Sequence, residues 1–184
     1  MKGDIIPDGE FLYKYVKPET FPDDQTEIPF GIFIDETLSC DWAAYQKNPE
    51  YSFHVKEGKT VIVRISVCSE IRHPCNPERP TQKQPAWEQK IEHDPVEKGQ
   101  DPSHPEVENL SHSLINGKKK NHVTKAIARN SVIYKQVNLE ALASVNIVEK
   151  ADSVTLEPAF DMGIALVFSS VVIIIILLII AFWS

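Results

Sequence analysis

Hydrophobic and polar residues alternate along several short segments of this chain, which is typical of strands with one buried face. The clearest case is 59–68, where Val61, Val63, Ile65 and Val67 occupy every second position. The same pattern, in shorter form, predicts further strands at 11–17, 30–35, 111–115, 131–137, 144–149 and 153–156.

Other segments favour helix. Residues 38–46 are predicted to form a short helix with Thr37 or Ser39 as its N-cap, and Asn48–Pro49 would end it. Asn116–Gly117 is a tight-turn signal, and the basic segment 118–129 after it is predicted to be helical. Residues 139–143 are predicted to form a helical turn. Together these elements predict an α+β head built mainly from antiparallel strands.

A proline-rich stretch interrupts this pattern at 72–106. Seven of the 13 prolines in the chain lie between Pro74 and Pro105. Proline cannot donate to a sheet ladder and breaks a helix interior, so this stretch is predicted to be a long loop. Such a loop is either a binding segment or a simple surface insertion.

The C-terminal segment from Met162 to Trp183 contains 22 residues without a charge or a proline. As a helix it would be roughly 33 Å long, enough to cross a hydrocarbon core of about 30 Å. A buried core strand is the alternative, because Val171–Ile180 is rich in β-branched residues, but strands seldom exceed ten residues. The pattern therefore predicts one transmembrane helix that contacts the lipid bilayer.

We expect this helix to act as an anchor rather than as a transport path, because it contains no ionisable residue. Ser169–Ser170 could support close helix packing in a homo-oligomer. The first residues, MKGDIIPDGE, do not resemble a signal peptide. The expected organisation is a soluble head at 1–161 in the cytoplasm and a single-pass tail anchor at 162–184. In that reducing compartment Cys40, Cys68 and Cys75 are expected to be free thiols.

Charge is distributed unevenly along the chain. The formal net charge is −7, yet residues 109–139 contain six Lys or Arg and no Asp or Glu. The basic residues begin directly after Gly117, at the start of the predicted helix, where backbone N–H groups favour anions. The candidate anion-binding residues are therefore Gly117, Lys118, Lys119, Lys120, Lys125 and Arg129.

This basic segment has two interpretations. Lys125 and Arg129 are four residues apart and would share a helix face that contacts a phosphate ligand, nucleic acid or acidic lipid. Alternatively, the segment is a solvated helix face opposite the acidic N-terminal third. The spacing does not match a phosphate-binding P-loop.

Candidates for catalysis and for metal binding are weaker. Asp41 and His112 could form an acid–base pair across the fold, although no local nucleophile signature accompanies them. Cys68, His73 and Cys75 lack a fourth ligand at standard zinc spacing, and the acidic residues from Asp35 to Asp41 are more typical of a solvated loop. The sequence thus predicts no metal site and implies no cofactor.

Three segments, LYKYVKPETF (12–21), GIFIDETLSCDW (31–42) and HSLINGKKKNHVTKAIAR (112–129), resemble a family of small uncharacterised bacterial proteins. The resemblance covers roughly a quarter of the chain. It implies a bacterial origin and one coherent domain, and it assigns no reaction. The matching positions are Asp41, His112, Gly117, Lys118 and Arg129.

Three functions remain open at this point. The leading hypothesis is a tail-anchored binding or regulatory module for an anionic partner at the inner face of a membrane. The second is a membrane-tethered hydrolase acting on a phosphate-bearing substrate through His112 with Lys118 or Arg129. The third is a small toxin-like or defence effector that perturbs the membrane.

Overall fold

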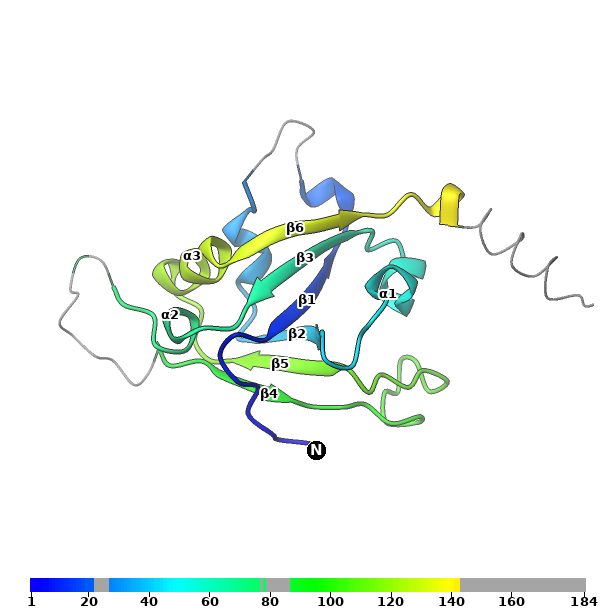
Figure 1. Cartoon of the computed structure of the whole chain (residues 1–184), viewed down its shortest axis with the longest axis horizontal. Coiled ribbons are helices and arrows are strands. Elements are labelled where there is room, and N and C mark those ends of the chain that lie inside the picture. The colour runs from blue at the N-terminus through cyan, green and yellow to red at the C-terminus, as the bar shows by residue number, and fades with distance from the viewer. Residues whose placement is uncertain (22–26, 77, 79–86, 143–184) are drawn as a thin grey trace, which may run out of the picture. The chain divides into compact units, whose positions relative to one another are not determined.

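The structure is a computed structural model, and it describes residues 1–21, 27–76, 78 and 87–142 (Figure 1). These residues belong to one compact unit, Met1–Leu142. Its centre is a six-stranded sheet in the order β4-β5-β2-β1-β3-β6, in which every pairing is antiparallel. The strands are β1 (Phe11–Val16), β2 (Thr37–Trp42), β3 (Val61–Ser66), β4 (Lys90–His93), β5 (His112–Asn116) and β6 (Ser131–Gln136).

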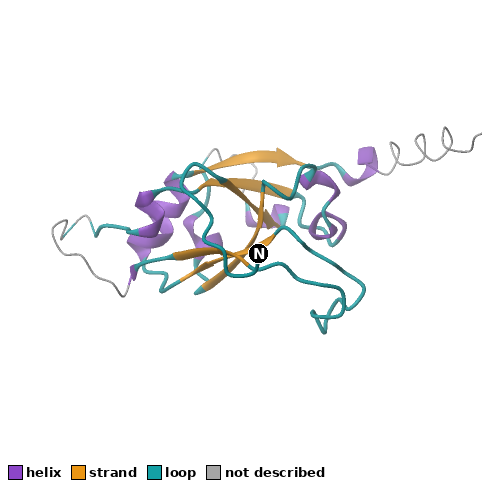
Figure 2. Ribbon diagram, turned by 60° about the horizontal axis from the view of Figure 1, so that its bottom comes forward, coloured by secondary structure: helices purple, strands orange, loops and turns teal. Residues whose placement is uncertain are grey.

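In the part of the chain that the structure describes, the helices are few and short (Figure 2). The longest there is α3 (Asn121–Arg129), and the shorter ones include the single turns α1 (Phe53–Lys56) and α2 (Ser69–Arg72) and the 3-10 turns η1 (Pro18–Thr20), η2 (Phe30–Phe33) and η3 (Pro49–Tyr51). The expectation of a mainly antiparallel sheet is confirmed, and the described domain contains few helices.

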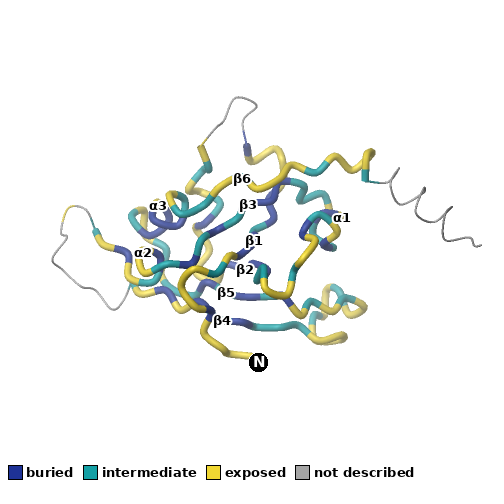
Figure 3. The backbone as a smooth tube through the Cα atoms, in the orientation of Figure 1, coloured by how far each residue is buried: buried dark blue, intermediate teal, exposed yellow. Residues whose placement is uncertain are grey.

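Different helices pack against the two faces of the sheet. On one face, Leu38 and Cys40 of β2 pack in the main core with Val123 and Ile127 of α3 and with Phe33 of η2. On the opposite face, Tyr13, Tyr15 and Ile62 pack with Val55 of α1 in a smaller cluster. Buried positions follow β1, β2, β3 and β5 in Figure 3, whereas β6 is largely exposed. Successive residues of a strand point to opposite faces, so β1 and β3 contribute to both clusters.

Four predicted strands and the predicted basic helix are confirmed with small shifts. Segments 11–17, 111–115 and 131–137 correspond to β1, β5 and β6, and 59–68 contains β3. Val61, Val63, Ile65 and Val67 all lie in the main core, as their spacing indicates. The basic helix begins at Asn121 rather than at residue 118, and residues 139–142 form the predicted helical turn.

Two predictions were wrong. Segment 38–46, expected to be helical, contains β2, because Thr37–Trp42 lies between β1 and β5 and completes backbone ladders on both sides. Segment 30–35, expected to be a strand, contains the 3-10 turn η2. It follows Pro29, and only Phe33 is fully buried while Phe30 and Ile34 remain exposed, so its burial lacks the period of a strand.

The proline-rich stretch is not wholly loop. Between Pro85 and Pro95 the chain forms β4, which pairs with β5 from Lys90↔Asn116 to His93↔Ser113. This ladder is formed by residues that contain no proline, so the local excess of proline does not prevent it. The isolated bridge Ile5↔Glu92 continues the sheet beyond β4 toward the N-terminus.

The predicted strands at 144–149 and 153–156 and the predicted span from Met162 to Trp183 lie outside the described residues. Within the described part of the chain, no helix is long and apolar enough to cross a membrane.

Candidate functional site

The hydrophobic side of α3 determines where its basic residues point. Val123, Thr124, Ala126 and Ile127 are buried, and they fix that side of the helix against the sheet. The exposed side then carries His122, Lys125 and Arg129, at the i, i+3 and i+7 spacing of one helix face. The prediction that Lys125 and Arg129 share a face is therefore confirmed.

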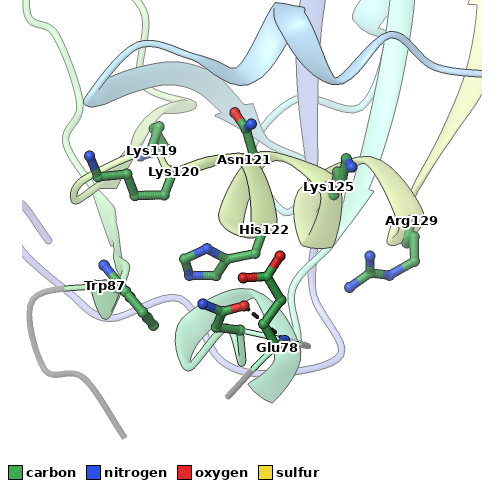
Figure 4. A pocket seen from close by; sticks show the side chains of 9 residues that line it. Glu78, Trp87, Lys119, Lys120, Asn121, His122, Lys125 and Arg129 are labelled. Carbon is green, nitrogen blue, oxygen red and sulfur yellow. Dashed lines mark hydrogen bonds between the residues drawn. The ribbon is translucent and has the colours of Figure 1, made fainter. Parts of the chain in front are cut away.

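A pocket of about 660 Å³ lies beside this exposed face (Figure 4). We refer to it as the α3 pocket. Its described lining residues come from α3, from the turn before it and from the chain on either side of residues 79–86: Asn76, Glu78, Trp87, Lys119, Lys120, Asn121, His122, Lys125 and Arg129. Four of the six residues predicted to bind an anion thus line a single pocket.

Lys119 differs from the other basic residues because its ammonium group is already occupied. The Nζ atom donates hydrogen bonds to the carbonyl oxygens of Ile115 and Gly117, both at 2.9 Å, and of Glu36 at 3.1 Å. Burial lowers the pKa of Lys119 to about 8, although the nearby Cys40, Glu36 and Asp35 oppose this shift. The three carbonyl acceptors favour the charged ammonium. Lys119 therefore holds the turn in place and adds positive charge to the pocket from its wall.

Arg129 is also partly engaged. Its Nε and Nη2 atoms donate to Oε1 of Glu70 in α2, at 3.2 Å and 2.5 Å. The hydrogen bonds from Arg129, and then that from Asn130, lower the pKa of Glu70. Because this pair is exposed, it neutralises much of the Arg129 charge without adding much stability.

Lys120 and Lys125 are the most available cations. Both are exposed, and Lys125 Nζ lies 5.7 Å from the centroid of the Phe30 ring. Lys120 is the N-cap residue of α3 and supplies no side-chain hydrogen bond to the first turn. The N-terminus of α3, with its partial positive charge, therefore adds to the potential of the pocket. Glu78 is the acidic group in the lining.

Two aromatic rings form another part of the lining. Trp87 and His122 meet edge to face, with ring centroids 4.2 Å apart. Desolvation lowers the pKa of His122, so the imidazole is neutral at pH 7. Its buried Nε2 atom has no hydrogen-bond partner within the described residues. Sequence analysis did not identify Trp87 or His122 as site residues, although His122 lies inside the basic segment.

Gly117 and Lys118 are not in the lining. Gly117 has a φ of +146°, and a Cβ atom there would lie 2.5 Å from the carbonyl oxygen of Glu88. The backbone carbonyl of Lys118 accepts a hydrogen bond of 3.2 Å from Nε2 of Gln89. The turn before α3 is thus packed closely against the chain that enters β4. This contact requires glycine at position 117, and the Lys118 side chain is left exposed.

The candidate acid–base pair lies on a different part of the sheet. Asp41 of β2 and His112 of β5 are direct cross-strand partners. Asp41 is fully buried, and desolvation raises its pKa, whereas the hydrogen bond of 2.8 Å from Asn109 Nδ2 to Oδ1 opposes the shift. Tyr15 and His112 also oppose it. Neither Asp41 nor His112 lines the α3 pocket, so the structure does not bring them to Arg129.

The cysteine and histidine residues near α2 do not form a metal site. Cys75 Sγ is 3.9 Å from the carbonyl oxygen of His73, and His73 Nδ1 is 3.6 Å from Glu88. Cys40, Cys68 and Cys75 are free. Within the ranges that the structure describes, no group of three His, Cys, Asp or Glu residues is placed to hold a metal ion.

Comparison of the chain with protein-family models, with curated proteins and with solved structures finds no match.

Proposed function

We propose that this chain is a membrane-anchored binding module whose head holds a phosphate-bearing ligand in the α3 pocket. The observation that carries the proposal is the convergence of Lys119, Lys120, Lys125 and Arg129 on one pocket. In this proposal the anchor is the apolar segment 162–183, the head comprises residues 1–161, and the head faces the cytoplasm.

The charges of the pocket support an anionic ligand. Lys120 and Lys125 are exposed, and Lys119 adds a third cation that is held in place by carbonyl groups. The N-terminus of α3 contributes a partial positive charge on the same side. The positive charge of these groups exceeds the negative charge of Glu78. The net electrostatic interaction of the pocket with a phosphate group is therefore attractive.

The aromatic rings favour a ligand that also contains a planar ring. Trp87 and His122 line the same pocket as the basic residues. Proteins that bind single-stranded nucleic acid combine basic residues with aromatic side chains on which bases stack. We therefore propose a nucleotide or a single-stranded nucleic acid as the ligand, ahead of an acidic lipid headgroup.

The test uses the full chain in nanodiscs of neutral lipid, with fluorescently labelled single-stranded oligonucleotide as the probe. Binding measured by anisotropy should weaken steeply with salt, because contacts to phosphate release counterions. Lys120→Gln combined with Lys125→Gln should weaken binding at least tenfold. Trp87→Leu should weaken it at constant net charge, because a stacked base is worth about 1–3 kcal/mol.

The control is Lys17→Gln combined with Lys98→Gln, which removes two lysines that do not line the pocket. It should change binding by less than twofold at physiological salt, where exposed charges are screened beyond about 8 Å. Wild-type protein that shows no salt-dependent binding would contradict the proposal. Binding that both double variants weaken equally would show attraction to overall charge rather than to the pocket.

A further inference from the structure

Three polar side chains meet on the sheet face opposite α3. Ser39 of β2 and His112 of β5 lie on neighbouring strands, and Asp94 directly follows β4. Ser39 Oγ is 2.9 Å from His112 Nε2. His112 Nδ1 is 2.7 Å from the backbone carbonyl oxygen of Asp94 and 3.7 Å from its carboxylate Oδ2. The three residues form a continuous chain of polar contacts.

These distances determine where the protons lie. A carbonyl oxygen can only accept a hydrogen bond, so Nδ1 of His112 must carry the hydrogen in the contact to Asp94. In the neutral imidazole Nε2 then carries the lone pair, and the Ser39 hydroxyl must donate to it. This is the arrangement that activates a serine nucleophile: the base is within hydrogen-bond reach, and another group orients the base.

Two carboxylates are placed to stabilise the imidazolium that would form when His112 accepts a proton. Asp94 Oδ2 faces Nδ1, while Asp94 Oδ1 is 3.0 Å from the Lys2 ammonium group. Asp41 is the direct cross-strand partner of His112. A Coulombic interaction with His112, like the hydrogen bonds of Asn109 and Tyr15, opposes the desolvation that raises the pKa of Asp41.

We propose that Ser39 is a nucleophile that cleaves carboxylic esters, with His112 as its general base. Ser39 Oγ attacks the ester carbonyl carbon, and its proton passes to His112 Nε2. The ester C–O bond then breaks, and the imidazolium gives the proton to the leaving alcohol. A water molecule cleaves the acyl-serine by the same route and regenerates the hydroxyl. This site is separate from the α3 pocket and does not depend on the function proposed there.

Both reacting groups are partly exposed to solvent. Ser39 is half-buried, and the His112 side chain is 17% exposed. A purely structural role for the pair would be mutual hydrogen bonding between two half-buried polar groups. A structural pair does not require the Ser39 hydroxyl to react with an electrophile. Measuring the reactivity of Ser39 therefore distinguishes a catalytic pair from a structural one.

The experiment treats the full chain, in nanodiscs of neutral lipid, with a fluorophosphonate coupled to a fluorophore. In this reaction the Ser39 Oγ–P bond forms and the P–F bond breaks, and the proton leaves through His112 with fluoride as the leaving group. Mass spectrometry of the labelled protein should locate the label on Ser39. Ser39→Ala should abolish labelling, and His112→Ala should slow it at least tenfold.

Two further measurements exclude a folding defect. Ser66→Ala is the matched control, because Ser66 is another half-buried serine at the end of β3, which β1 separates from β2 in the sheet, and it should label at the wild-type rate. Added imidazole should restore part of the labelling of His112→Ala, which a merely structural histidine would not allow. Folded wild-type protein that is not labelled at Ser39 would overturn the proposal. Labelling that is unchanged in His112→Ala would overturn it equally.

Discussion

Arg129 at the end of α3, a lining residue of the α3 pocket, forms a hydrogen-bonded ion pair with Glu70 in α2, with the closest contact at 2.5 Å. This pair joins the two helices on that side of the sheet. It also removes positive charge from the place where an anionic ligand would bind. The pair therefore weakens the ligand site that the proposed function requires.

We expect Glu70→Gln to tighten binding of an anionic probe severalfold, because it leaves the Arg129 charge uncompensated. Stability should fall by less than about 1 kcal/mol, since the ion pair is exposed. Glu50→Gln is the matched control: it removes the same charge from an ion pair with Lys135, neither of which lines the pocket. Binding isotherms at low and physiological salt would check this, and an equal gain in both variants would contradict it.

Gly117→Ala should destabilise the head by about 2 kcal/mol, because strained backbone and overpacking each cost energy on this scale. The added Cβ would lie 2.5 Å from the Glu88 carbonyl oxygen, at a positive φ that alanine rarely adopts. Gly31→Ala is the control, because its Cβ would have no neighbour within 4 Å. Denaturant unfolding of both variants measures the difference. Similar midpoints for the two variants would mean that the contact with Glu88 relaxes easily.

The sequence predicts best those elements whose burial is decided locally. In β3 the apolar residues alternate, and one side of the basic helix is apolar, so both elements and the shared face of Lys125 and Arg129 follow from spacing. By contrast, β2 is a strand because of its neighbours on both sides. Its local sequence, with short polar residues before Trp42, does not indicate this central position.

In the candidate sites too, some features follow from local sequence and others only from contacts between distant segments. The sequence places the basic residues of the α3 pocket within one segment, but Trp87 comes from a distant part of the chain and reaches His122 only through the fold. Likewise, Lys119 cannot be told apart from Lys118 and Lys120 by sequence, because its acceptors include the carbonyl of Glu36. Contacts between distant segments therefore decide which basic residues are held by the fold and which are left exposed in the pocket.

The stability of the head should decrease as the pH falls below about 6.5, and His54 should contribute to this decrease. Desolvation, and then the charge of Lys59, lowers the pKa of His54 from 6.5 to about 3. Between these values the unfolded chain binds a proton that the folded chain excludes. One such proton makes the free energy of unfolding fall by up to about 1.4 kcal/mol per pH unit.

Replacement of His54 by phenylalanine should therefore make the decrease shallower between pH 6 and pH 4. Phe53→Leu is the control, because Phe53 packs against the His54 ring at 3.9 Å between centroids and does not titrate. That variant should lose stability by a similar amount at every pH in this range. Unfolding by urea at several pH values would measure both slopes. Equal slopes for the wild type and His54→Phe would show that another group controls the acid sensitivity.

The proposed membrane anchor is tested by removing the apolar segment 162–183. We expect the full chain to sediment with membranes and to resist extraction with alkaline carbonate, whereas a chain ending at Asp161 should remain in the supernatant without detergent. Ile175→Arg is the sharper variant, because it changes one residue near the middle of the apolar segment 162–183. A central arginine costs about 2.5–3.5 kcal/mol of insertion free energy, so this variant should be extracted more readily. Protease added outside intact cells should leave the head undigested if it faces the cytoplasm. If the chain ending at Asp161 partitions with membranes as fully as the full chain, the head itself binds the bilayer and the segment is not needed as an anchor.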